Sequence, residues 1–247
     1  MKIGFICMLI GALLSGSAIY YVTKKQNTNE LQSVKIQKLH TAESAVKSRL
    51  SIIESKLIDQ LTAFSNAVST DKNFSLKMFV ENDLSSSDIV EIAGRYLKAM
   101  DFSVLEVTDS SGRIVSSGHF PASAGQNISE HIAALSTRPV AIKENIMGNQ
   151  VLTLQSKKTF EIADFKFYAI GGYEINPKLL KELSPWDEVI VLLQNGNDYI
   201  GMKDIRSISE IKDQSIIIND KEYYATRIPV SSVNEKAELS LLVIISK

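Results

Sequence analysis

The chain has 247 residues, with 27 Lys and Arg against 28 Asp and Glu, which gives a formal net charge of −1. This balance excludes a generic polyanion binder and predicts no nucleic-acid partner, because no basic excess is present to neutralise phosphates. Apolar residues make up 45% of the chain, so a buried core in one large or two small domains is expected. The single cysteine, Cys7, excludes a disulfide scaffold within one chain, and three histidines argue against a metalloenzyme.

The first predicted element is a membrane helix. Residues 3–22 are apolar or small and carry no charge, and lysines flank the run on both sides. Twenty residues in a helix span about 30 Å, which matches the hydrocarbon core of a bilayer. Tyr20 and Tyr21 lie where an interfacial aromatic belt is expected. We therefore interpret residues 1–26 as a transmembrane signal anchor.

A cleaved signal peptide is the alternative interpretation of this segment. Small residues at Ser15–Ala18 offer a cleavage site. The apolar run continues beyond that site through Val22, which favours the anchor. An N-terminal anchor predicts a single-pass protein of the inner (cytoplasmic) membrane, with its body in the periplasm or outside the cell.

A long stalk helix is predicted over residues 27–74. Apolar residues recur here every three or four positions, which places them on one helix face. They are Leu39, Ala42, Val46, Leu50, Ile53, Leu57, Leu61, Phe64 and Val68. This face packs on a globular core in one interpretation, and in the other its first half also pairs with a second copy of the chain, because the same spacing suits a coiled coil.

The body that follows reads as two similar series of elements. After a helix that Ser85–Asp88 would cap, the first series has strands at 102–109, 113–118, 139–146, 151–160 and 165–170, with a short helix at 125–135. Asp109–Gly112 is predicted to turn the first pair of strands. A helix capped by Asn176 comes next, and the second series has strands at 188–194, 199–202, 215–219, 221–229 and 237–246.

Two segments resemble the extracytoplasmic double Cache sensor domains of bacterial histidine kinases and chemoreceptors. Residues 104–115, Val-Leu-Glu-Val-Thr-Asp-Ser-Ser-Gly-Arg-Ile-Val, are similar to the Cache hairpin of strand, D-x-x-G and strand. Residues 167–183, with Gly171-Gly172 and a following Leu-Leu-Lys-Glu-Leu, are similar to the junction between the two modules. Residues 222–230 resemble a late strand of the membrane-proximal module. The resemblance covers about residues 28–247.

The resemblance implies an α+β fold with two PAS-like antiparallel-sheet modules in tandem. The membrane-distal module would hold residues 75–178 and the membrane-proximal module residues 179–247. In such sensors a small ligand sits in the distal module, between the sheet and the loops that cover it. We therefore predict a small-molecule ligand, the membrane and a homodimer through the stalk helix as partners. The aromatic and Arg-rich run of amino-acid-binding Cache domains is missing, so that ligand class is not supported.

Three residues of the first series are candidates for ligand binding. His119 follows the second strand, near the expected pocket mouth. Arg138 begins a strand, where its guanidinium would hold a carboxylate in bidentate geometry. Tyr168 lies at a strand centre, where its hydroxyl would reach a pocket. Each also has a simpler interpretation, as a surface histidine, a surface arginine and a core tyrosine. His131, on the short helix, is expected to face solvent.

Catalysis has little support in the sequence. It contains no nucleophile elbow, no phosphate-binding loop and no zinc-protease motif. Asp109 is interpreted as the residue that starts a turn, and Gly171-Gly172 as a bend between the modules. We therefore expect a signal-transduction sensor of a two-component or chemotaxis system, with no enzymatic activity, catalytic residue, cofactor or metal. An exported binding or assembly protein that presents this domain by itself is the alternative.

Overall fold

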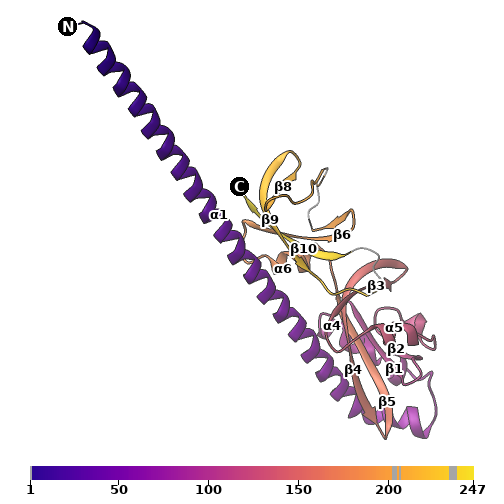
Figure 1. The fold of residues 1–247 in the computed structure, drawn as a ribbon. Helices are drawn as coiled ribbons and strands as arrows, with labels where there is room; N and C mark the ends of the chain where they lie inside the picture. The colour runs from indigo at the N-terminus through magenta and orange to yellow at the C-terminus, as the bar shows by residue number, and fades with distance from the viewer. Residues whose placement is uncertain (1, 202–204, 206, 234–237) are drawn as a thin grey trace.

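The computed structural model describes residues 2–201, 205, 207–233 and 238–247, with side chains described from residue 30 onward. In these ranges one long helix, α1 (Lys2–Ser69), runs along two antiparallel sheets, as predicted (Figure 1). Figure 1 shows the first sheet near the C-terminal end of α1 and the second beside its middle. The division into modules at 75–178 and 179–247 stays a prediction.

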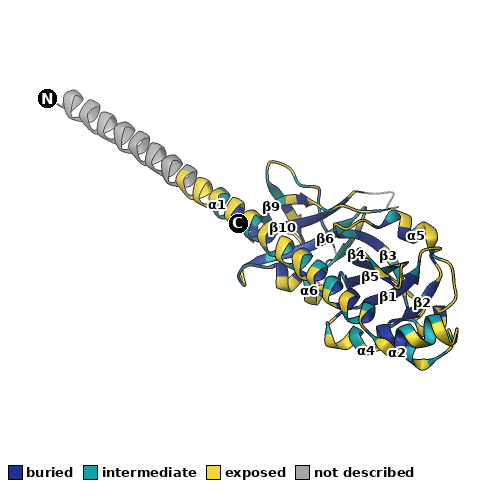
Figure 2. Ribbon diagram, turned by 90° about the horizontal axis from the view of Figure 1, so that it is seen from below, coloured by how far each residue is buried: buried dark blue, intermediate teal, exposed yellow. Residues whose placement is uncertain are grey.

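The apolar stripe predicted for the long helix is the face that α1 buries. Its members toward the first sheet are Leu57, Leu61, Phe64 and Val68, and those toward the second sheet are Leu39, Ala42 and Val46. All are at most 1% exposed. Figure 2 shows buried and exposed residues alternating along this part of α1, as the helical period requires. One helix thus contributes to the cores beneath both sheets.

The first sheet has the strand order β2-β1-β5-β4-β3. Its strands are β1 (Val104–Asp109), β2 (Ile114–Ser117), β3 (Val140–Ile146), β4 (Asn149–Ile162) and β5 (Phe165–Glu174). The predicted turn between β1 and β2 is confirmed: Asp109 Oδ1 accepts hydrogen bonds from the backbone N–H groups of Ser111 and Arg113, at 2.9 and 3.0 Å. Gly112 supplies the positive φ of +86° that this turn needs.

The second sheet repeats this order as β7-β6-β10-β9-β8. Its strands are β6 (Val189–Asn195), β7 (Asp198–Ile200), β8 (Ser215–Ile218), β9 (Lys221–Pro229) and β10 (Leu239–Ser246). Asn219 and Asp220 form the turn between β8 and β9, with φ of +48° and +65°. β10 is central in the sheet and is buried from Leu239 to Ile245, and Ser240 is the one polar residue in that stretch.

The two sheets are joined directly and through α1. The Ala141 N–H of β3 donates to the Ser231 carbonyl at 2.7 Å, and the Val233 N–H donates to the Ala141 carbonyl at 2.9 Å. Arg49 of α1 donates to three carbonyls just before the second sheet, those of Glu182, Ser184 and Pro185. A shift of one sheet relative to α1 would therefore disturb contacts of the other.

The connecting helices differ in part from the sequence prediction. The predicted stalk helix, residues 27–74, is interrupted: α1 ends at Ser69 and a separate short helix, α2 (Lys72–Ser75), follows. A π-helix, η1 (Leu76–Val80), then precedes the capped helix. The expected single helix is two pieces, α3 (Ser87–Val90) and α4 (Ile92–Ala99), because the backbone leaves helical geometry around Glu91. The other connecting elements are the 3₁₀ turn η2 (Pro121–Ser123), α5 (Ser129–Ala134) and α6 (Pro177–Leu183).

The Gly171-Gly172 pair was interpreted as a bend between modules, and this was wrong. Both glycines lie inside β5, which continues to Glu174. A Cβ atom on Gly171 would lie 2.7 Å from Leu61 Cδ2, and one on Gly172 would lie 2.7 Å from the Leu154 carbonyl oxygen. The glycines are therefore needed because α1 and β4 approach this strand closely.

Within the described part of the chain, no helix combines the length and the hydropathy needed to cross a membrane. The predicted anchor segment, residues 3–22, lies outside the residues whose side chains are described. The anchor therefore stays a prediction.

Candidate functional site

The two faces of the first sheet have different chemistry. Leu105 and Val107 of β1 join the core with Leu57 and Leu61 of α1. Because side chains alternate along a strand, Glu106 lies on the opposite face. This outer face also carries Ser117, which pairs with Glu106 in the β1–β2 register. A carboxylate thus lies between Leu105 and Val107 in the buried part of the strand.

A chain segment, residues 119–135, covers the outer face. It is hydrogen-bonded to the β1–β2 hairpin: the Ile114 N–H donates to the Gln126 carbonyl, and the Ile128 N–H donates to the Gly112 carbonyl, both at 2.8 Å. Between cover and sheet lies a cavity of about 140 Å³. Its lining residues are Glu106, Ile114, His119, Phe120, Ser123, Gln126, Ile128, His131, Glu144 and Asn145. We call this space the outer-face cavity.

A buried histidine and a buried glutamate meet in this cavity. His119 is 3% exposed and Glu106 is 5% exposed. His119 Nε2 lies 3.8 Å from Glu106 Oε1 and 4.0 Å from Glu144 Oε1, which is longer than a hydrogen bond. On its other side, His119 Nδ1 lies 3.3 Å from the Ser117 hydroxyl oxygen. The imidazole is therefore held from the sheet side, and its Nε2 faces two carboxylates.

A second polar group lies across the cavity. Gln155 Nε2 donates to Glu144 Oε2 and to Thr153 Oγ1, both at 2.9 Å. Gln155 Oε1 lies 3.0 Å from His131 Nε2, and that nitrogen is 3.6 Å from Glu144 Oε2. His131 was expected to face solvent, but its ring is hydrogen-bonded to Gln155 of the sheet. These contacts tie α5, in the cover, to β3 and β4.

Burial sets the protonation of this cluster. It raises the pKa of Glu106 to about 7, and the negative charge of Glu144 acts in the same direction, while a hydrogen bond from Ser117 opposes them. Burial also lowers the pKa of His119, against the attraction of Glu144. His119 is therefore neutral at pH 7, and Glu106 exchanges a proton near that pH. Groups with shifted pKa values in a cavity are typical of binding sites.

The structure separates the three residues that the sequence proposed as ligand contacts. His119 lines the outer-face cavity. Arg138 is exposed, and its backbone N–H is bonded to the Ser136 hydroxyl. The half-buried ring of Tyr168 lies under the ammonium groups of Lys157 and Lys166, at 5.9 and 5.3 Å from its centroid. Neither Arg138 nor Tyr168 lines the cavity.

The sequence reasoning missed the two glutamates. Glu106 had a visible signal, because it interrupts the apolar run Val104-Leu105-Glu106-Val107 at a position that becomes buried. Glu144 had none, since it lies in a half-exposed edge strand whose pattern allows a charge. The two carboxylates meet only because the strand order brings β1 and β3 beneath one cover.

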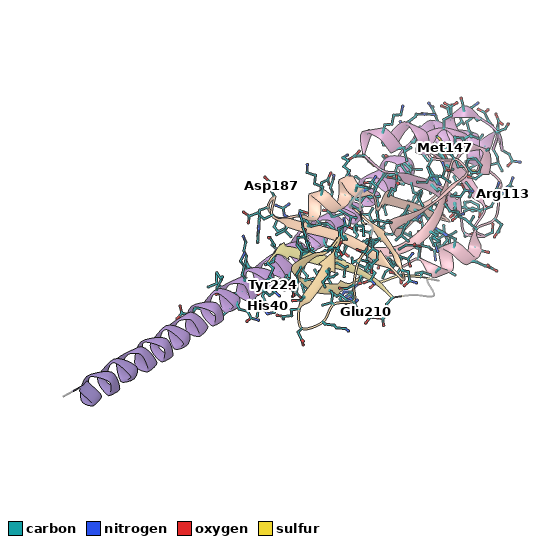
Figure 3. All side chains as sticks on the ribbon, turned by 90° about the horizontal axis from the view of Figure 1, so that it is seen from above. His40, Arg113, Met147, Asp187, Glu210 and Tyr224 are labelled. Atoms are coloured by element: carbon teal, nitrogen blue, oxygen red, sulfur yellow. The ribbon has the colours of Figure 1, made fainter. Side chains whose placement is uncertain are left out.

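A larger hollow of about 510 Å³ lies between η1, the β1–β2 hairpin and the start of β5. Phe79 and Phe165 stack there with ring centroids 5.0 Å apart, and Phe165 is 60% exposed. Arg113, labelled in Figure 3, also lines this hollow and is exposed. The hollow is open and mainly apolar, and no buried titratable side chain faces it among the described residues. The outer-face cavity is therefore the candidate site.

The fold is that of periplasmic sensor domains of bacterial receptors, which confirms the resemblance seen in the sequence. No family model and no curated protein sequence matches the chain. Among solved structures, the periplasmic domain of Vibrio cholerae LuxQ matches with a TM-score of 0.53 at 16% identity, over 86% of this chain and 98% of its own.

Two further structures have similar scores. The sensor domain of the V. cholerae histidine kinase DctB gives a TM-score of 0.50 at 9% identity, over 85% of this chain and 98% of its own. The ligand-binding domain of the Pseudomonas aeruginosa amino acid chemoreceptor PctB, solved with L-Arg, gives 0.51 at 11% identity, over 87% and 96%. Such low identities establish the shared fold alone.

Proposed function

We propose that this chain is an extracytoplasmic sensor domain that binds a small ligand in the outer-face cavity and passes a conformational change along α1. In this proposal residues 1–26 anchor it in the inner membrane, with the sheets on the periplasmic or outer side. The observation that carries the proposal is a cavity lined by two carboxylates and two imidazoles on the face of the first sheet that α1 leaves free. The fold shared with known sensor domains supports it.

Signal transmission follows from the position of the cavity. The cover binds β1, β3 and β4 from outside, while β1 and β5 pack on α1 from inside. A ligand that draws the cover toward the sheet would change how the sheet sits on α1. For this to signal, the ligand must bind one arrangement more tightly than the other. The Arg49 contacts and the Ala141 hydrogen bonds would carry the change to the second sheet.

A variant that closes the cavity tests the binding site. Gln126 is exposed and lines the cavity at its cover, so a Gln126→Trp side chain can fill the opening at little cost to the core. Small acids, amines and amino acids are screened against the full chain in detergent by thermal shift, since a ligand of the folded state raises Tm by mass action. A ligand of this site is expected to lose its Tm shift in Gln126→Trp.

The matched control for this test is Ala133→Trp. Ala133 is exposed on α5 and does not line the cavity. It is expected to keep the full shift. If every ligand that raises Tm does so equally in Gln126→Trp, the outer-face cavity is not the site. If no compound class raises Tm at all, ligand sensing fails and an assembly role gains support.

We also propose a homodimer through the exposed face of α1. Leu31, Val34 and Ile52 are 62%, 60% and 63% exposed on this helix. Leu31 and Ile52 are 21 positions apart, which is three heptads, so a supercoiled partner helix could contact both. Such large apolar side chains on a solvent face are typical of an interaction surface.

A double variant, Leu31→Glu with Val34→Glu, tests this surface by placing like charges where the two helices would meet. It is expected to weaken the dimer by about tenfold or more, measured by sedimentation of the full chain in detergent. Ile217→Glu is the control, because Ile217 is equally large, 48% exposed and located on β8. A monomer in the unmodified chain, or equal effects of both changes, would disprove this interface.

A further inference from the structure

The charges that line the outer-face cavity have one sign. Glu106 and Glu144 contribute carboxylates, and the other titratable groups are His119 and His131. No lysine or arginine is among the residues that line this cavity. Lys157, two positions along β4 from Gln155, donates to the Ile132 carbonyl and lies over Tyr168. The site therefore has negative charge without a matching permanent cation.

The internal contacts do not replace that cation. Glu144 accepts neutral hydrogen bonds, from Gln155 Nε2 and from the Asn145 N–H, both at 2.9 Å. Glu106 has His119 as its nearest ring partner, at 3.8 Å, and burial disfavours the charged imidazole. His119 is 3% exposed, and its Nε2 lies 3.8 Å from Glu106 Oε1 and 4.0 Å from Glu144 Oε1. A buried carboxylate without a cationic partner is costly, and a bound cation would relieve that cost.

The cavity also limits the size and kind of the cation. A space of about 140 Å³ is smaller than the usual pocket for a drug-sized ligand, so only a compact molecule fits. No set of His, Cys, Asp or Glu side chains in the described residues is arranged to hold a metal ion. A free amino acid would bring a carboxylate into a site that lacks a basic partner for it.

We infer that the outer-face cavity selects a small organic cation without a carboxylate, such as an alkylammonium or a short diamine. The ammonium group lies between Glu106 and Glu144, beside the imidazole of His119, while Phe120, Ile114 and Ile128 contact the carbon chain. This inference rests on the proposed function, because it takes the cavity to be the ligand site. The inferred ligand class differs from that of the PctB domain, whose structure holds the amino acid L-Arg.

The test measures binding of defined probes to the full chain in detergent, by calorimetry and thermal shift. The probes are ethylammonium, ethanolamine and 1,4-diaminobutane, against acetate, glycine and zinc ion. At least one amine is expected to bind and raise Tm, while acetate and glycine leave Tm unchanged. Glu144→Gln is expected to weaken amine binding by about tenfold or more, because a charge-assisted hydrogen bond is replaced by a neutral one.

Glu106→Gln is expected to weaken binding similarly while the protein stays folded, which separates lost binding from lost structure. Glu161→Gln is the matched control: Glu161 is exposed near the end of β4, outside the cavity, and the change should leave the affinity as it was. If acetate or glycine binds and Gln126→Trp prevents that binding, the cavity is the ligand site, but the inference that its ligand is an organic cation without a carboxylate is wrong. If zinc alone binds, or no amine binds at millimolar concentrations, the inference is overturned.

Discussion

A Glu106→Gln variant is expected to be more stable than the unmodified protein above neutral pH, and the advantage should disappear in acid. The pKa of Glu106 is raised in the folded state from 4.5 to about 7, mainly by burial. Below pH 4.5 both the folded and the unfolded chain are protonated at this position, so the group has no destabilising effect there. Between these two values the unfolded chain releases its proton first, so the free energy of unfolding falls as pH rises.

Glutamine keeps the shape of the side chain but cannot ionise. The variant therefore does not lose unfolding free energy at this position as pH rises. The difference in unfolding free energy between the variant and the unmodified protein should therefore grow by about 3 kcal/mol from about pH 4 to about pH 8. Denaturant unfolding at several pH values measures it. His119, with its lowered pKa, destabilises the fold in acid, but it is present in both proteins and largely cancels in the difference.

The Glu161→Gln change is the matched control, because it makes the same substitution at an exposed side chain outside the cavity. A flat profile for Glu106→Gln would show that Glu106 ionises in the folded state as easily as in the unfolded chain. Combined with the ligand measurement, the variant is expected to be more stable and less able to bind. That combination is typical of a functional group kept in an unfavourable environment.

A Leu57→Ala variant is expected to lose about 2–5 kcal/mol of unfolding free energy, as large-to-small changes in a closed core do. Leu57 is 0% exposed and packs under the first sheet with Leu105 and Val107. The lost contacts and the cavity left behind both lower the unfolding free energy. The cavity cannot collapse, because the other buried residues of α1 hold the helix in place on either side. Chemical denaturation followed by circular dichroism measures the change.

Leu31→Ala is the matched control, since it makes the same substitution on the same helix at a side chain that is 62% exposed. Its effect on the unfolding of the monomer is expected to stay below about 0.5 kcal/mol. Equal losses in the two variants would mean that Leu57 is not in a closed core. Because α1 serves both sheets, the Leu57→Ala transition should remain cooperative, with one midpoint for the whole described body.

The sequence was sufficient for most of the fold because the fold depends on local rules. Runs of β-branched and apolar residues bounded by turn residues identified the strands, and Asp109 and Asn176 marked a turn and a helix start through hydrogen bonds to nearby backbone. β4 and β5 are longer than the predicted strands at 151–160 and 165–170, and for β5 the reason is that the Gly171-Gly172 pair looked like a strand end. The π-helix at Leu76–Val80 has no sequence rule that predicts it.

The site was predictable only in part, because it depends on which strands become neighbours. His119 was placed near a pocket mouth from its position after the second strand, and it lines the cavity. Arg138 was expected to bind a ligand because a strand was predicted to start there, but β3 begins at Val140, and Arg138 is exposed and does not line the cavity. Glu106 and Glu144 come from strands separated by β5 and β4, and only the cover between His119 and Leu135 brings them into one space.

The central place of β10 has a consequence for how this protein is made. β10 separates β6 from β9, although it follows both in the chain. During synthesis, β6 and β9 therefore present unpaired edges until residues 239–246 leave the ribosome and insert between them. The first sheet has the same arrangement with β5, but its closing strand comes earlier and can dock on α1 at once. We expect the first sheet to form early and the second to be the part that needs protection from aggregation.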